Sequence, residues 1–84
     1  MKEAERITME KIFSILQGLR PELDFHESNN YIEDGFLDSF DVISLVSELE
    51  ETYGIIIDGL DIVPENFLNA DTIAELVKKS GGRI

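Results

Sequence analysis

Apolar residues recur at helical spacing in three separate stretches of this chain, and this pattern restricts the fold more than any other feature. The first stretch covers residues 3–19 and places its apolar side chains on one helical face. These are Met9, Ile12, Phe13, Leu16 and Leu19. Gly18 and Pro21 predict its end, because proline disfavours helical backbone at the preceding residue.

The second stretch has the clearest boundaries. Asp38 is a good N-cap, since its carboxylate can accept hydrogen bonds from exposed backbone N–H groups, and Ser39 is then the first helical residue. Leu37 and Val42 occupy the positions of a hydrophobic staple, and Gly54 is a C-terminal stop. The inward face contains Val42, Leu45, Val46, Leu49 and Tyr53.

The stretch that follows is ambiguous. Residues 55–63 hold two β-branched runs around Asp-Gly, which is a hairpin signal, but two three-residue strands without a third make a poor sheet. We therefore expect an extended loop that packs its isoleucines inward. Residues 64–68 should form one short helical turn that begins with proline. The last helix should cover residues 70–79, with Asn69 or Asp71 as its cap.

These elements predict an all-α fold, a small antiparallel bundle of three main helices plus one short helix, with a long loop after helix one. The loop covers residues 21–37 and should be pinned to the core by Phe25, Tyr31, Ile32 and Phe36. A chain of 84 residues suits a single domain, residues 1–84, with one modest core. That leaves little room for a deep catalytic cavity, which favours a binding module.

The charge is strongly negative and unevenly placed. The net charge is −11, no Lys or Arg lies between Pro21 and Val77, and fifteen of the eighteen acids lie there. Such a surface repels nucleic acid and anionic lipid and attracts basic protein surfaces. It could serve as a solubilising face, but a segment so long without a base favours a recognition surface.

The sequence lacks the residues that several other classes of protein require. There is no Cys and no apolar run of about 20 residues, so we expect no disulfide, thiolate metal site or membrane span. The N-terminal sequence does not resemble a secretory signal, so we expect a cytoplasmic protein. We also expect it to be a monomer. His26, the one histidine, lies in a loop-like segment, which favours a surface residue over a catalytic base. An EF-hand calcium loop that began at Asp24 would need Gly at its sixth position and Glu at its twelfth, but the sequence has Asn29 and Gly35 there.

One residue, Ser39, remains as a candidate functional site. Ser39 places a hydroxyl at the start of an amphipathic helix, directly after a loop, where it should be exposed. A helix N-terminus carries about half a positive charge and free N–H donors, which favour a phosphate group. The alternative is that Ser39 is an ordinary N-terminal serine without a function.

The stretch GFLDSFDVISLVSELEETYGI resembles the modification region of acyl carrier proteins and related peptidyl and aminoacyl carriers. The resemblance extends over nearly the whole chain, in the order of its elements. It implies that Ser39 receives 4′-phosphopantetheine from coenzyme A. It implies that Asp38 is the acid that the transferase reaction uses near its magnesium ion, and that Gly35 lets the loop turn into the motif. No catalytic residue and no resident metal is implied.

The resemblance also implies partners. A phosphopantetheinyl transferase would add the arm, and an acyl or aminoacyl ligase and cargo-using enzymes with basic surfaces would read an acidic helix. We expect Asp41, Glu48 and Glu51 to face solvent as the docking residues. The rival hypothesis is an unmodified acidic helical adaptor that binds a basic partner.

Four positions depart from the family pattern. They are Phe40 in place of the usual Leu, Ser44 in place of an acid, Ser47 in place of Met, and Ile56 in place of an acid. These departures favour a freestanding carrier of a specialised pathway over one of fatty-acid synthesis. The Gly-x-Leu-Asp-Ser-Phe run is also similar to D-alanine carrier proteins of cell-wall modification, and the cargo stays open between acyl, aminoacyl and D-alanyl groups.

Overall fold

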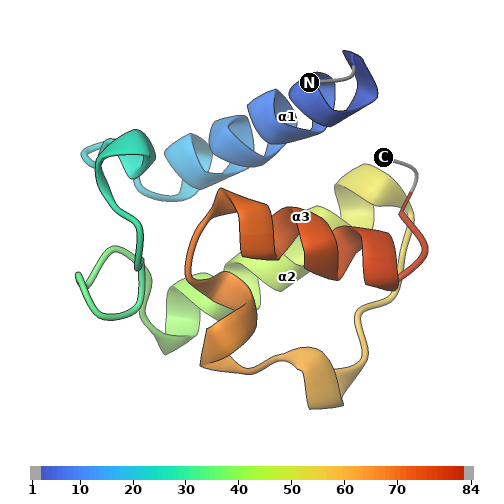
Figure 1. Ribbon diagram of the computed structural model, residues 1–84. Helices are drawn as coiled ribbons and strands as arrows, with labels where there is room; N and C mark the ends of the chain where they lie inside the picture. Colours follow the sequence, from blue (N-terminus) through green and yellow to red (C-terminus); the bar gives the residue numbers. More distant parts are fainter. Residues whose placement is uncertain (1–2, 83–84) are drawn as a thin grey trace.

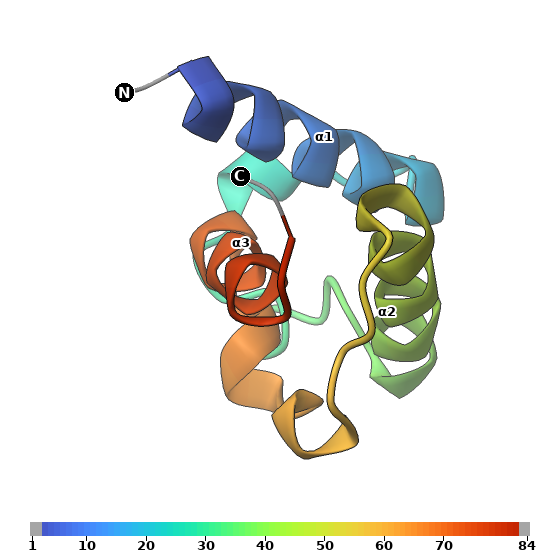
Figure 2. The ribbon, with the colours of Figure 1, turned by 90° about the vertical axis from the view of Figure 1, so that its right-hand side faces the viewer.

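The structure, a computed structural model, describes residues 3–82. Three helices dominate it: α1 (Glu3–Leu19), α2 (Ser39–Tyr53) and α3 (Ala70–Lys79). Three short 3-10 helices lie between them: η1 (Phe25–Glu27), η2 (Gly59–Asp61) and η3 (Pro64–Phe67). The helix α1 packs on both α2 and α3. It runs in the opposite general direction to them in Figure 1, and Figure 2 shows that it crosses them at a steep angle. The all-α prediction is confirmed, with η3 as its short fourth helix.

The core lies between the three helices and is closed by side chains from the connecting segments. Each helix contributes the apolar face that its spacing predicts, while Phe25, Tyr31 and Phe67 are supplied by the connections between helices. The residues with the least exposure are Ile12, Leu16, Phe25, Tyr31, Leu37, Leu45, Leu49, Phe67, Ile73 and Val77.

Capping side chains set where the helices begin and end. The Asp38 carboxylate accepts from the Asp41 N–H at 2.9 Å, and the Asp41 carboxylate accepts from the Asp38 N–H at 3.1 Å, which forms a reciprocal capping box. Gly54 ends α2 with φ of 64°. Asn69 caps α3 by accepting from the Thr72 N–H at 2.9 Å, which decides between the two predicted caps.

The long loop is held by its aromatic side chains, as predicted. The rings of Phe25 and Tyr31 meet edge to face at 5.1 Å, and the Tyr31 hydroxyl donates to the Phe25 carbonyl at 3.1 Å. The Tyr31 N–H donates to the Leu68 carbonyl at 2.7 Å, which ties the loop to the segment before α3. Phe36 and Ile32 pack against the same core. These contacts therefore fix the position of the loop that leads to Ser39.

The segment after α2 differs from its prediction in one respect. Residues 55–58 form an open loop between α2 and η2 (Figure 1), and none of the described residues, 3–82, forms a strand. Ile55 and Ile57 are buried, but Ile56 is 84% exposed and Ile62 is 38% exposed. The expectation that all these isoleucines pack inward was therefore wrong for Ile56 and Ile62. Burial thus alternates along Ile55, Ile56 and Ile57, a pattern typical of extended backbone, in which successive side chains point to opposite sides.

Candidate functional site

Ser39 is exposed at the point where the long loop becomes α2. The approach to it depends on Gly35, which adopts φ of 74° and donates its N–H to the Ile32 carbonyl at 3.2 Å. A left-handed backbone of this kind favours glycine. Leu37 is buried two residues before Ser39 and anchors the start of the helix to the core.

Asp38, directly before Ser39, has an exposed carboxylate that caps α2. The N–H of Asp41 that it accepts lowers the pKa of Asp38 below its ordinary value, with a smaller contribution from Arg20. A carboxylate that receives N–H donors favours its charged form. Asp38 is therefore ionised at neutral pH and puts one negative charge next to the Ser39 hydroxyl.

Asp41 does not face solvent in the way the sequence suggested. Its side chain is 17% exposed, because its carboxylate receives Arg20 Nη1 at 2.9 Å as well as the Asp38 N–H. The Arg20 Nε also donates to Glu22 at 2.9 Å. The expected solvent-facing position of Asp41 is thus corrected: this residue links the end of α1 to the cap of α2.

The two other expected docking residues, Glu48 and Glu51, are exposed. Glu50, between them, is half-buried and accepts the Ile57 N–H at 2.9 Å, which fastens the loop after α2 to that helix. The solvent-facing acids of this helix are therefore Glu48 and Glu51, and they lie in its C-terminal half, away from Ser39.

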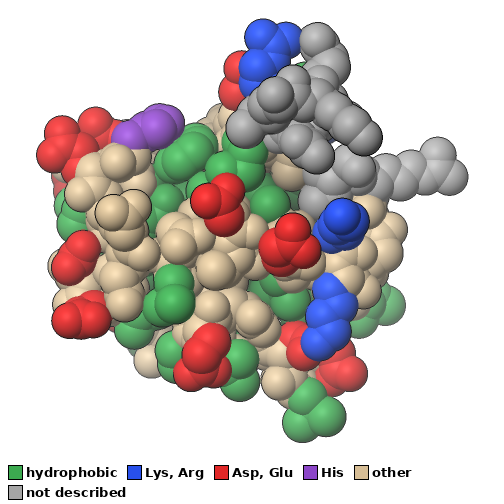
Figure 3. All heavy atoms as spheres, in the orientation of Figure 1, with side chains coloured by type: hydrophobic (Ala, Val, Ile, Leu, Met, Phe, Trp, Pro, Cys, Tyr) green, Lys and Arg blue, Asp and Glu red, His purple; other side chains and the backbone are tan. Residues whose placement is uncertain are grey.

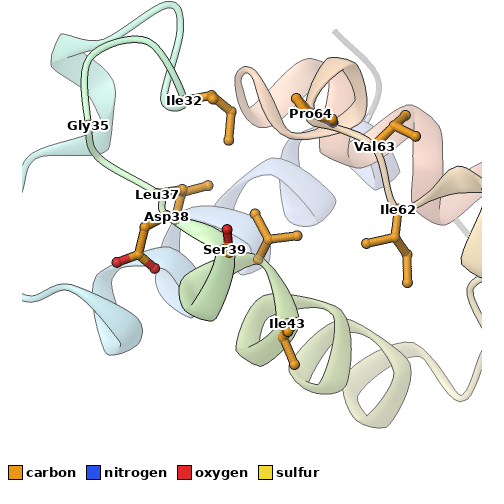
Figure 4. Close-up of a pocket in the computed structure, with 10 residues that line it drawn as sticks. Ile32, Gly35, Leu37, Asp38, Ser39, Ile43, Ile62, Val63 and Pro64 are labelled. Carbon is orange, nitrogen blue, oxygen red and sulfur yellow. The ribbon is translucent and has the colours of Figure 1, made fainter.

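A cleft of about 570 Å³ opens next to Ser39. One side is formed by the first two turns of α2, including Val42 and Ile43, and the other by Ile62, Val63 and Pro64 (Figure 4). Apolar side chains make up most of its wall. The sequence did not indicate this cleft, because its two sides come from segments about twenty residues apart that only the tertiary fold brings together.

The single histidine is occupied in ordinary contacts. The His26 ring stacks on Phe13 at 3.9 Å between centroids, and its Nδ1 lies 3.1 Å from the Asp24 carboxylate. Across residues 3–82, no set of three or more His, Asp or Glu side chains is arranged to hold a metal ion. Every helix in that same part is too short or too polar to cross a membrane.

Comparison with protein families adds the remaining observation. The family model described as a phosphopantetheine attachment site matches residues 10–79, which include every residue discussed for this site. No curated protein matches the chain. The match covers most of the sequence and confirms the family that the motif around Ser39 indicates. The chain therefore belongs to the phosphopantetheine-attachment family of carrier proteins, which bear a 4′-phosphopantetheine group and are not themselves catalytic.

Proposed function

We propose that this protein is an acyl or aminoacyl carrier with its 4′-phosphopantetheine arm on Ser39. The thiol of the arm would hold cargo as a thioester, and the protein would present that cargo to partner enzymes without performing chemistry itself. A phosphopantetheinyl transferase would add the arm, and a ligase and cargo-using enzymes with basic surfaces would follow. We place this activity in a cytoplasmic monomer.

The location of Ser39 carries the proposal. Residues 10–79, which the family model matches, contain five serines. Ser28 is buried and donates to Asp34 at 2.7 Å, while Ser14, Ser44 and Ser47 lie inside helices. Ser39 is the one of the five that is exposed at a helix N-terminus and directly follows a loop. An incoming enzyme can reach its hydroxyl without unwinding a helix.

The surroundings of Ser39 suit a phosphodiester. Attachment forms a bond from the Ser39 oxygen to the phosphorus of the pantetheine phosphate in coenzyme A, breaks its bond to the adenosine bisphosphate, and releases the hydroxyl proton. The helix N-terminus favours the phosphate that remains. The carboxylates of Asp38 and Asp41 would repel this phosphate, but Arg20 compensates the charge of Asp41. Asp38 keeps its negative charge, which supports its proposed role near the magnesium ion of the transferase reaction.

Between the two cargo classes, the cleft favours an acyl chain. Its wall beside Ser39 is largely apolar, and burial of a hydrocarbon there would be favourable by about 0.8 kcal/mol per methylene. An aminoacyl cargo would bring an ammonium group, which this wall could not solvate. We therefore propose an apolar acyl group as the cargo, with the exposed Glu48 and Glu51 attracting basic partner enzymes.

The test is intact mass after incubation with coenzyme A and a broad-specificity phosphopantetheinyl transferase. We expect a gain of one phosphopantetheine group, lost in Ser39→Ala with the circular dichroism unchanged, because the first helical position tolerates Ala. Ser44→Ala and Ser47→Ala serve as matched controls on the same helix and should be modified as the parent is. Absence of any mass gain would favour the unmodified acidic adaptor, and label on Ser44 or Ser47 would contradict the assignment of Ser39.

A further inference from the structure

We infer that Arg20 is a positioning residue for the attachment of the arm at Ser39, and that it acts through the Asp41 carboxylate. The inference rests on the proposed function and adds to it a residue that lies outside the modification motif. Arg20 directly follows the last residue of α1, whereas Ser39 is the first residue of α2.

One oxygen of Asp41 connects Arg20 to the backbone directly before Ser39. The Asp41 Oδ2 atom accepts from Arg20 Nη1 at 2.9 Å and from the Asp38 N–H at 3.1 Å. The second of these bonds is one half of the capping box, and the bond from the Asp41 N–H to the Asp38 carboxylate is the other half. Because both halves join the same two residues, Arg20 helps to hold the backbone and the carboxylate that precede the reacting hydroxyl.

Arg20 makes one local and one long-range contact. Its Nε donates to Glu22, two residues along the chain, whose side chain is 59% exposed. Its contact with Asp41 joins residues 21 positions apart, and the Asp41 side chain is only 17% exposed. Surface ion pairs contribute little to stability. A purely structural role therefore predicts that loading of Ser39 is unchanged when Arg20 is replaced, whereas a positioning role predicts slower loading.

Arg20 is also the one base in the central part of the chain. Residues 12–77 contain no other Lys or Arg. The start of α2 carries the carboxylates of Asp38 and Asp41, and attachment at Ser39 would add a phosphodiester beside them. Without the guanidinium, these negative groups would repel one another with only about half a positive charge from the helix N-terminus to offset them. Arg20 therefore places a positive charge where a negative group must be added.

The existing contacts of Arg20 favour action through Asp41 over direct contact with coenzyme A. Both Nε and Nη1 already donate to carboxylates, so the guanidinium is largely neutralised within the protein. A residue that bound coenzyme A directly would change the KM for coenzyme A. A residue that positions the reacting groups would instead change kcat.

The experiment measures steady-state loading of the full chain by a purified phosphopantetheinyl transferase with coenzyme A, read by intact mass. Arg20→Gln should lower kcat about tenfold and keep the KM for the carrier within about twofold, because Asp38 and Ser39 would be bound but less well placed. Arg20→Lys keeps the charge and a donor, so it should restore most of the loss. Circular dichroism checks the fold of each variant, and an unfolded Arg20→Gln would make the residue structural and overturn the inference.

Two further variants separate positioning from charge. Lys79→Gln is the matched control, because it also removes one positive charge and breaks an ion pair between distant parts of the chain, at 2.7 Å from Asp61. It should keep the parent kcat. Asp41→Asn keeps an acceptor for the Asp38 N–H but has no charge for Arg20 to compensate. In that background, Arg20→Gln should lower kcat by less than about twofold.

The outcomes separate this inference from the function beneath it. If the parent protein gains no mass, the proposed function fails and the inference fails with it. If the parent is modified at Ser39 while Arg20→Gln keeps the parent kcat, the positioning role is overturned and the carrier function stands. An equal fall in kcat for Lys79→Gln would overturn it too, since net charge would be responsible. So would a loss confined to either KM, or an effect of Arg20→Gln that persists fully in Asp41→Asn.

Discussion

Asp38 stabilises the start of α2 through its charge, which makes that helix end sensitive to acid. Its pKa is lowered in the folded protein, chiefly by the Asp41 N–H. A lowered pKa means stabilisation that is present above the unfolded value of about 4 and is lost as pH falls through the folded value. We predict that the first turn of α2 frays below about pH 4, as seen by NMR chemical shifts of the Phe40 and Asp41 amides.

Asp38→Asn is the control for this acid response. Asn caps a helix as well as Asp does but does not titrate, so the variant should keep its first turn with a smaller change between pH 6 and pH 3, about the range over which the carboxylate responds. Asp38→Ala should lose the cap at every pH. An acid response in Asp38→Asn equal to that of the parent would show that other carboxylates are responsible.

Substitution of the two tyrosines by Phe should change the free energy of unfolding in opposite directions. The Tyr31 hydroxyl donates to the Phe25 carbonyl, whereas the buried Tyr53 hydroxyl has no hydrogen-bond partner within the described residues. An unsatisfied buried polar group costs free energy that a made bond does not. We predict that Tyr31→Phe lowers the free energy of unfolding by about 1 kcal/mol and that Tyr53→Phe raises it by about 1 kcal/mol.

Urea unfolding at neutral pH measures both changes. Burial raises the pKa of both hydroxyls, that of Tyr31 to about 12, so neither titrates under these conditions. Equal destabilisation by the two substitutions would mean that the Tyr53 hydroxyl finds a partner such as water.

At the scale of elements, substitution of two helix glycines by Ala should change the stability of the protein in opposite directions. Gly18 lies inside the last turns of α1, and a Cβ there would meet nothing within 4 Å. Gly54 has the same free space but adopts φ of 64°, which costs a non-glycine residue about 1 kcal/mol. We predict that Gly18→Ala stabilises the protein by about 0.5–1 kcal/mol and that Gly54→Ala destabilises it by about 1 kcal/mol. Thermal unfolding of the two variants, side by side, provides the check, and a gain in both would refute the role of the αL cap.

The same local signals explain which elements the sequence predicts well. The bounds of α2 and the exposure of Ser39 follow from a cap, a staple and a glycine that are neighbours along the chain, and α3 follows in the same way from Asn69. The ion pair of Arg20 with Asp41 joins residues 21 positions apart, so no spacing rule reveals it. The inward or outward direction of Ile56, and the wall of the cleft at Ile62, likewise depend on tertiary packing that a single sequence does not display.

Across the whole molecule, the excess of acids should make stability depend on ions. On the face in Figure 3, acidic side chains are spread over the surface, and the basic ones lie at the top and in the right-hand part. Arg20 and Lys79 make ion pairs with Asp41 and Asp61, but a net charge of −11 leaves most acids to repel one another. Their repulsion is screened beyond about 10 Å at 0.1 M salt. We predict that the melting temperature rises as salt is added from low ionic strength, measured by calorimetry.

The counter-test is a variant with less negative charge. Glu27→Gln with Glu33→Gln removes two exposed acids of the long loop and should flatten the dependence on salt. A parent melting temperature that stays constant or falls with salt would show that the acids are too widely spaced to destabilise the fold.

The ion pair between Arg20 and Asp41 also defines a pivot. It fastens the end of α1 to the first turn of α2, and Leu37, two residues before Ser39, is buried in the core. A tether attached at Ser39 would therefore swing from a fixed point, and the volume swept by its free end would depend on the tether alone. The effective concentration of a cargo at a docked partner is set by that volume. A loosened pivot would enlarge it and dilute the cargo, even with every docking contact intact.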